Sequence, residues 1–438
     1  MIERYENTRI KKIWSKPYRY DLWEKISLKY LNNKMNRDNI YPTARYAEVI
    51  EKYEKKTKHE FVAFLTHLHE RLEHYKDPEI LQNLHYGLTS SDVIDTAFNL
   101  QLRHSYGEVS GRLHELIRSV SDILKRLNDV KCIGRTHGKH AEQMNFNSRF
   151  KLFEEELKYT RNLLDLASDH LYGQLTGPVG TSSYVDTGAA KKTLQELSIF
   201  PAPITTQVVP RFYSATLMHS LALFAQAIER MATQIRLMAI DEINEVQEGF
   251  AKGQAGSSAM PHKKNPISSE KLCGLARIIK NNYLTILDNN NLWWERDMSH
   301  SSVERIVWPQ SFHIICHMMD TMSDVLDNLV INYDVISSNL ENSNADSHKQ
   351  LLSETVESTR LAAYANVQRT YIGETASQKE PPQTINSPTH FLVISEAGEN
   401  FYFQANSTHE AELLYNEENL SPMETHTHIH QIIQLKEV

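Results

Sequence analysis

The chain has 438 residues with a formal net charge of −8, and it contains 15 glycines, 14 prolines and 3 cysteines. So few glycines and prolines exclude collagen-like, low-complexity and wholly disordered chains, and they disfavour all-β folds, which need many turns. The length predicts two or three domains. The acidic balance argues against a nucleic-acid binder with a basic surface, although a few local cations can still hold an anionic substrate.

The cysteines Cys132, Cys273 and Cys316 are too scattered for a disulfide framework or a CxxC metal site. Residues 1–20 lack the apolar core of a signal peptide, and no stretch approaches the ~18 uncharged apolar residues of a membrane span. We therefore expect a cytoplasmic protein in a reducing compartment, with neither a membrane nor a nucleic acid as partner.

Apolar residues recur at alternating steps of three and four along three segments, 102–127, 146–171 and 217–238. Such spacing gives a helix one continuous apolar face, which suits near-parallel packing against other helices. No proline interrupts any of the three segments. The longest helix is expected over 212–248, and it would be roughly 55 Å long at ~1.5 Å per residue. We predict an all-α fold built on a long helical bundle.

The bundle divides the chain into three predicted domains. Residues 1–96 form an N-terminal helical domain, residues 97–349 the central bundle, and residues 350–438 an atypical C-terminal domain in which helical periodicity fades. Apolar, β-prone residues at 391–394 and 401–404 indicate a β-hairpin in that last domain.

Four polar segments interrupt this architecture. The first, His85–Asp92, lies just before a long helical stretch and carries Thr89 and Ser90. Residues of these types cap helix N-termini. The same position also attracts anions, because free backbone N–H groups and the helix dipole point outward there. A helix cap and an anion site therefore stay open as alternatives.

The second segment, residues 134–142, places His137 in a break between two of the helical stripes. A lone histidine is usually structural, but this one lies beside glycine, arginine and a second histidine, His140. Its ordinary pKa near neutrality suits proton transfer. The two histidines lack a clear third ligand, so we predict no metal site.

The third segment, residues 252–270, replaces helical periodicity with glycines, serines and prolines, followed by two adjacent lysines. It fits neither a Walker A loop nor a GxSxG motif. Ser257 and Ser258 near Lys263 suit a serine whose hydroxyl proton is made labile by positive charge. We expect a mobile loop over 252–266.

The fourth segment, residues 294–305, carries Arg296, Ser301, Ser302 and Arg305. If helical, it presents cations and hydroxyls to a phosphate or carboxylate. A solvated, charged helix end is the open alternative.

These segments resemble a known family. Residues 256–266, Gly-Ser-Ser-Ala-Met-Pro-His-Lys-Lys-Asn-Pro, are similar to the GSSxMPxKxNP loop of the fumarase/aspartase superfamily. The other three segments, with the start of the chain and residues 58–64, resemble the adenylosuccinate lyase family within it. The resemblance extends from residue 1 to about residue 335 and is thin afterwards.

The resemblance implies an all-helical, three-domain subunit in a homotetramer whose active sites are shared between copies. It also implies β-elimination of fumarate from adenylosuccinate and from succinylated imidazole carboxamide ribotide (SAICAR), in purine nucleotide biosynthesis. No metal and no organic cofactor are implied. The substrate partner would be a small anionic nucleotide.

The resemblance also assigns roles to residues. His137 matches the general acid, Ser257 the general base, and Lys263 and Asn265 the ligands of the succinyl carboxylates, with Ser258 beside them. Glu270 and His59 match further catalytic residues, a carboxylate paired with the catalytic region and a histidine near the acid. The predicted substrate contacts are Arg4, Tyr5, Lys58, His85, Thr89, Ser90, Asp92, Gln207, Ser258, Asn265, Arg296, Ser301, Ser302 and Arg305.

Two alternatives stay open at this point. One is a lyase for another succinyl compound, and the other is a non-catalytic structural homologue that keeps the motifs without turnover. Lys271 stands where the family commonly has an asparagine that contacts substrate, and the last ~70 residues are atypical for the family.

Overall fold

The structure is a computed structural model that describes residues 2–250, 260 and 263–343. It also describes the backbone of three strands between residues 389 and 435. The chain divides into two compact units, residues 1–350 and 351–438, and each is described here by itself. The three-domain division remains a prediction.

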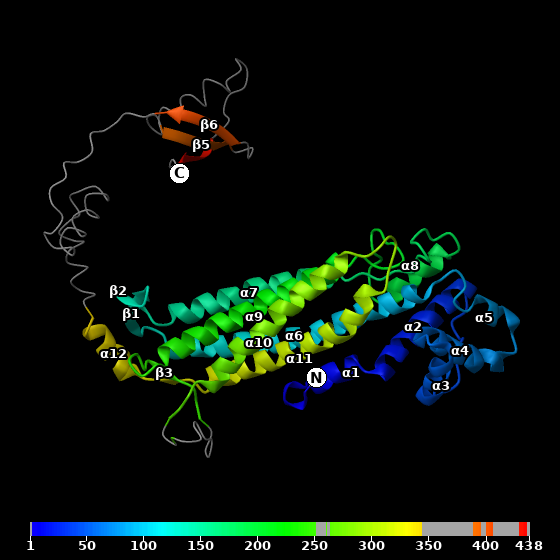
Figure 1. Cartoon of the computed structure of the whole chain (residues 1–438), viewed down its shortest axis with the longest axis horizontal. Coiled ribbons are helices and arrows are strands. Elements are labelled where there is room, and N and C mark those ends of the chain that lie inside the picture. The colour runs from blue at the N-terminus through cyan, green and yellow to red at the C-terminus, as the bar shows by residue number, and fades with distance from the viewer. Residues whose placement is uncertain are drawn as a thin grey trace. The chain divides into compact units, whose positions relative to one another are not determined.

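The N-terminal helices begin along the bundle and gather at one end of the first unit, where the third, fourth and fifth of them lie (Figure 1). Their boundaries follow local signals: Asn7 and Ser15 cap the first two with side-chain oxygens, and Pro78 begins the fifth. These elements are η1 (Glu3–Tyr5), α1 (Thr8–Ile13), α2 (Lys16–Met35), α3 (Ala47–Thr57), α4 (Glu60–Leu72), η2 (Glu73–Tyr75) and α5 (Pro78–Asn83).

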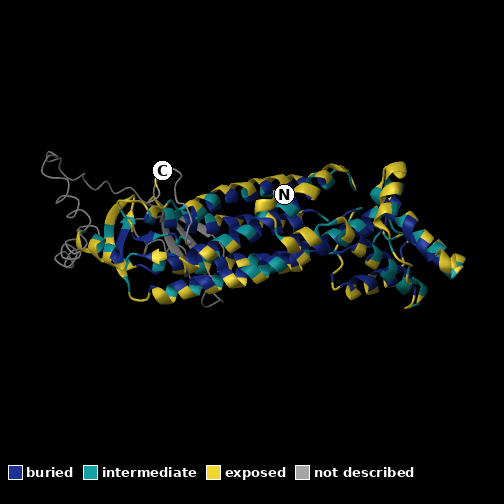
Figure 2. Ribbon diagram, turned by 90° about the horizontal axis from the view of Figure 1, so that it is seen from below, coloured by how far each residue is buried: buried dark blue, intermediate teal, exposed yellow. Residues whose placement is uncertain are grey.

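Five long helices of the first unit run side by side (Figure 1). They contact one another in the closed order α6–α7–α9–α10–α11 and back to α6, so each has a neighbour on both sides. The faces that these helices turn toward one another are buried and the outer faces are exposed (Figure 2), and most of the buried residues are apolar. The predicted bundle is thereby confirmed, and its helices are α6 (Ser90–Arg126), α7 (Ser148–Asp169), α9 (Phe212–Met238), α10 (Ile267–Leu287) and α11 (Ser299–Asp327).

The predicted end of the helix over 212–248 is wrong, because α9 ends at Met238. Asn244 has a left-handed backbone (φ +46°), a conformation that asparagine adopts more readily than most residues. The chain then enters the short strand β3 (Val246–Gln247), which pairs with β4 (Val330–Ile331). The apolar spacing continues into this strand, and it gave no sign that the helix stops.

A β-hairpin stands at the same end of the bundle as β3, opposite α3, α4 and α5 (Figure 1), where the sequence indicated only a break between helices. Strands β1 (Lys131–Thr136) and β2 (Lys139–Asn145) pair antiparallel. His137 and Gly138 form the turn, both with positive φ (+53° and +73°), as in the two-residue turns that join hairpin strands. The smaller elements are α8 (Thr187–Glu196), η3 (Asp288–Asn290) and α12 (Tyr333–Glu341).

The bundle core is continuous and aromatic. Trp308 and Phe312 of α11, Phe150 of α7 and Phe224 of α9 are all fully buried. A second apolar cluster joins α2 and α4 to the first part of α6 and to α8. Among the described helices, none combines the length and the apolar character that crossing a bilayer requires.

The second unit contains a three-stranded antiparallel sheet in the order β6-β5-β7. Strands β5 (Thr389–Ser395) and β6 (Asn400–Ala405) form the hairpin that the sequence indicated. The third strand, β7 (Ile429–Leu435), was not predicted.

Candidate active site

A cavity of about 640 Å³ opens between the N-terminal helices and the first turns of α6 and α11. Six of the residues singled out from the sequence line it. They come from three separate stretches of the chain and are Lys58, His59, Ser90, Arg296, Ser301 and Arg305. The fold therefore brings together Ser90 of the first polar segment, three residues of the fourth segment, and residues 58–59.

Local backbone structure presents the first two of these residues. Lys58 ends α3 in a left-handed conformation (φ +54°), which turns the chain toward α4. His59 is the N-cap of α4, and its Nδ1 accepts a hydrogen bond from the backbone N–H of Val62 at 3.4 Å. Because Nδ1 is an acceptor there, the ring proton of a neutral His59 lies on Nε2, where it can be donated to a ligand.

At the start of α6, the cap predicted for this position is confirmed. Thr89 and Asp92 form a capping box. The fully buried Asp92 carboxylate accepts from the backbone N–H groups of Thr89 (2.7 Å), Thr176 (2.7 Å) and Gly177 (3.2 Å). Burial raises the pKa of Asp92 to about 6, against the effect of these bonds. Asp92 thus fixes the loop, and Ser90 and Ser91 are the members of this segment that line the cavity.

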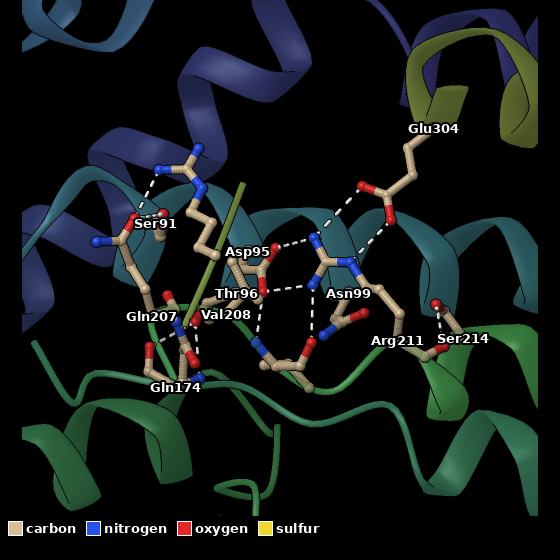
Figure 3. Close-up of polar contacts among 12 residues, drawn as sticks. Ser91, Asp95, Thr96, Asn99, Gln174, Gln207, Val208, Arg211, Ser214 and Glu304 are labelled. Atoms are coloured by element: carbon tan, nitrogen blue, oxygen red, sulfur yellow. Dashed lines mark hydrogen bonds and ion pairs between the residues drawn. The ribbon is translucent and has the colours of Figure 1, made fainter. Parts of the chain in front are cut away.

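Gln207 holds Arg296 at the cavity wall. Its Oε1 accepts from Arg296 Nη1 at 2.7 Å and from Ser91 Oγ at 3.4 Å, while its Nε2 donates to the carbonyl of Pro178 at 2.9 Å. The Nε of Arg296 is buried and has no hydrogen-bond partner among the described residues. Burial lowers the pKa of Arg296. Figure 3 shows Gln207 and Ser91 beside the α6 backbone.

A buried ion triad lies next to this pair, and sequence reasoning missed it (Figure 3). Arg211 donates both Nη atoms to Asp95 at 2.7 Å, and its Nε donates to Glu304 at 2.9 Å. The three side chains are at most 9% exposed, and all of them line the cavity. One cation thus joins the starts of α6, α9 and α11.

The surroundings change the protonation of two groups here. Burial raises the pKa of Glu304 to about 7, although Arg211 opposes the shift. Burial, with Arg211 adding to it, lowers the pKa of His300 to about 4, so this histidine is neutral at neutral pH. Both line the cavity. The sequence does indicate that both are buried. His300 and Glu304 precede Trp308 at steps of four, which places them on the apolar face of α11.

The cations of the cavity fall into two groups. Arg19 pairs with Glu60, and Arg211 pairs with Asp95 and Glu304. Lys58, Arg296 and Arg305 form no ion pair with any described residue. The cavity therefore carries three cations without a carboxylate partner in the described part of the chain, and this arrangement attracts an anion.

Other predicted residues lie outside the cavity. Tyr5 of η1 contacts His317 of α11, with ring centroids 4.9 Å apart, and Arg4 lies near enough to Lys271 to lower its pKa together with burial, which is the main cause. His85 packs against the Phe61 ring at 5.2 Å, and burial lowers its pKa to about 4. Ser302 donates to the carbonyl of Ser299 at 3.1 Å.

The predicted acid and its neighbours lie at the opposite end of the bundle from α3 and α4 (Figure 1). His137 is exposed at the tip of the β1–β2 hairpin. Lys263 and Asn265 lie just before α10, and Glu270 is exposed in its first turn. Ser257 and Ser258, with most of the loop predicted over 252–266, lie outside the described residues. One chain alone does not bring His137 into the cavity.

Comparisons with known proteins agree with one another. A family model described as "Lyase" matches residues 32–280. Adenylosuccinate lyase of Aquifex aeolicus is 35% identical over 354 residues, covering 78% of this chain and 80% of that protein. Adenylosuccinate lyase of Thermotoga maritima is 35% identical over 405 residues, covering 90% of each.

Solved structures share the fold at low sequence identity. A fumarate lyase from Mesorhizobium sp. BNC1 matches with a TM-score of 0.70 at 19% identity, covering 83% of this chain and 85% of that one. A 3-carboxy-cis,cis-muconate lactonizing enzyme from Pseudomonas putida matches with a TM-score of 0.71 at 18% identity, with the same coverage. These likenesses confirm the all-α, fumarase/aspartase-like fold class.

Proposed function

The chain belongs to the adenylosuccinate lyase family, and we propose that it releases fumarate from adenylosuccinate, leaving AMP, and from SAICAR, leaving AICAR. One observation on this molecule carries the proposal. Lys58, Arg296 and Arg305 line one cavity without a carboxylate partner in the described part of the chain. A nucleotide that bears a phosphate and two carboxylates supplies the matching negative charge.

The residue types suit β-elimination. A base removes the proton next to a succinyl carboxylate, the carbon–nitrogen bond breaks, and an acid protonates the leaving nitrogen. We assign the base to Ser257 and the acid to His137. Lys263 and Asn265 hold the carboxylate on which negative charge develops, with Ser258 beside them. Glu270 is assigned to the same catalytic region, and the elimination requires no cofactor.

The cavity residues hold the nucleotide in this proposal. Arg296, Ser301 and Arg305 bind the phosphate and ribose, and Gln207 keeps Arg296 in place through its 2.7 Å hydrogen bond. His59 donates from Nε2 to the substrate near the acid. Arg4 and Tyr5 complete a phosphate contact from another copy, because they lie along α11 beside His317 rather than in the cavity.

We propose a homotetramer whose sites are shared between copies. The support is the placement of the His137 hairpin and the start of α10 at the opposite end of the bundle from α3 and α4 (Figure 1), two helices whose residues line the cavity. A second copy must therefore supply them. Exposed apolar residues recur every seven positions along α7, at Leu152 (53%), Tyr159 (65%) and Leu166 (56%), and such a stripe suits burial against another helix.

The proposal is tested with two variants, His137→Gln and Ser257→Ala, in a fumarate-release assay. Each should lose release while its circular dichroism spectrum stays that of the unchanged protein. Mixing and reassembling the two variants should restore part of the activity, because some sites then receive both intact residues. Unchanged turnover in both variants would refute the assignment, and release from argininosuccinate alone would identify a different succinyl substrate.

A further inference from the structure

The hairpin that carries His137 is tied to the bundle by a carboxylate far from the cavity. Glu245 is fully buried. Its Oε1 accepts from Arg135 Nη1 at 2.9 Å, and its Oε2 accepts from Arg149 Nη1 at 3.3 Å. Arg135 lies on β1, two residues before His137. A single carboxylate therefore joins the hairpin to the start of α7.

Hydrogen bonds hold both the backbone and the side chain of Glu245. Its backbone N–H donates to the carbonyl of Met238 at 2.9 Å, and its carbonyl accepts from the N–H of Asn332 at 3.0 Å. Asn339 of α12 adds a hydrogen bond from Nδ2 to Oε1 at 3.3 Å. The carboxylate that receives Arg135 is thus fixed by α9, α12 and the segment before it.

The tip of the hairpin lacks such support. His137 is exposed, and a side chain built on Gly138 would meet no atom within 4 Å. Near the base, Arg149 Nη2 donates to the carbonyl of Ile133 at 3.3 Å. The direction in which the tip projects therefore depends on how the base of the hairpin is held.

The strand that follows Glu245 holds a second segment. Gln247 Oε1 accepts from Lys264 Nζ at 3.3 Å. Glu248 Oε1 accepts from the backbone N–H of Ser269 at 2.7 Å and from its hydroxyl at 2.6 Å. Asn265 lies between these two anchor points, and Lys263 directly precedes the first of them. One short stretch, residues 245–248, is the common base of the hairpin and of the segment that begins α10.

We infer that Glu245 is a positioning residue for the elimination: through Arg135 it holds the hairpin so that His137 projects in the orientation that protonates the leaving nitrogen. This inference rests on the proposed function. Glu245 does not touch substrate. Removing its charge leaves Arg135 and Arg149 without their shared partner, and the hairpin base loses its fixed direction. Misplacing a reacting group by about 1 Å costs up to ~100-fold in rate.

The test compares Glu245→Gln with Glu24→Gln, a matched control. Glu24 also accepts from two arginines, Arg71 at 2.6 Å and Arg45 at 3.5 Å, but it lies in the N-terminal helices and outside the cavity. Steady-state fumarate release from adenylosuccinate is measured for both, and kcat is divided by the fraction of folded chain from circular dichroism.

For Glu245→Gln we expect kcat per folded chain to fall about 10- to 100-fold while KM stays within about twofold. Glu24→Gln should keep the unchanged kcat per folded chain. A kcat within about twofold of the unchanged protein in Glu245→Gln, with His137→Gln inactive, would overturn the inference. A purely structural role for Glu245 predicts that outcome.

If Glu245→Gln does not fold, a second variant tests the inference. Arg135→Lys keeps the positive charge but loses the guanidinium geometry on Glu245, and its side chain is 16% exposed, so the change is tolerated more easily. It should lower kcat several-fold with KM unchanged, and an unchanged kcat would overturn the inference. If the unchanged protein releases no fumarate, the proposed function fails first.

Discussion

The buried Glu304 makes the stability of this protein depend on pH in a calculable way. Its pKa is about 7 in the folded protein and 4.5 in an unperturbed carboxyl group. The folded state therefore binds more protons than the unfolded state between those values. The contribution of Glu304 to the free energy of unfolding is therefore fully present below about pH 4.5. It is lost as the pH rises through about 7.

The size of the effect follows from the same numbers. A pKa difference of about 2.5 at ~1.4 kcal/mol for each pH unit gives about 3 kcal/mol for the whole titration, of which at most about 2.5 kcal/mol is lost between pH 5 and pH 8. Glu304→Gln removes this titration. Arg211 keeps both of its 2.7 Å contacts with Asp95. The variant should therefore gain stability relative to the unchanged protein as the pH rises.

The assay is urea unfolding of both proteins at pH 5, 6, 7 and 8, at one fixed protein concentration. The difference between their unfolding free energies should change by at most about 2.5 kcal/mol from pH 5 to pH 8, in favour of the variant at high pH. Asp92, whose pKa is also raised by burial, is the same in both proteins and cancels in the difference. Parallel curves from pH 5 to pH 8 would refute the reasoning.

Three further predictions follow from the contacts described. Arg211→Met leaves Asp95 and Glu304 buried without their cation and should lower the unfolding free energy by about 3–5 kcal/mol at pH 7.5, measured by urea unfolding; a loss below about 1 kcal/mol contradicts the triad's role. Arg296→Gln should raise the KM for adenylosuccinate about tenfold in initial-rate assays, and KM should then depend less on salt concentration. An unchanged KM would show that Arg296 does not bind the substrate. Leu152→Glu places a charge on the exposed stripe of α7 and should reduce the sedimentation coefficient; an unchanged value shows that α7 does not face another copy.

Helix positions were predictable from the sequence because apolar spacing records which face of a helix is buried. The stripes over 102–127, 146–171 and 217–238 all lie within or across bundle helices. The end of α9 was not predictable from spacing, because the apolar pattern continues past Met238 into β3. The hairpin around His137 was missed because its mostly exposed residues show no alternation.

The sequence predicted residues of the site only where they belong to one of the recognisable polar segments. Arg296, Ser301 and Arg305 line the cavity as the polar segment suggested. Asp95, Arg211 and Glu304 were missed because a charged residue in a sequence is normally assigned to the surface. The separation of His137 from the cavity is a property of the fold, since spacing along the sequence does not state at which end of the bundle a residue lies.

The unpaired cations of the cavity are proposed to hold a nucleotide from which this enzyme eliminates fumarate. The most direct measurement is to incubate the purified full chain with adenylosuccinate and to quantify AMP and fumarate together. We expect both products to appear in equal amounts and His137→Gln to form neither. Failure of the unchanged protein to form either product, or fumarate without AMP, would contradict the proposal.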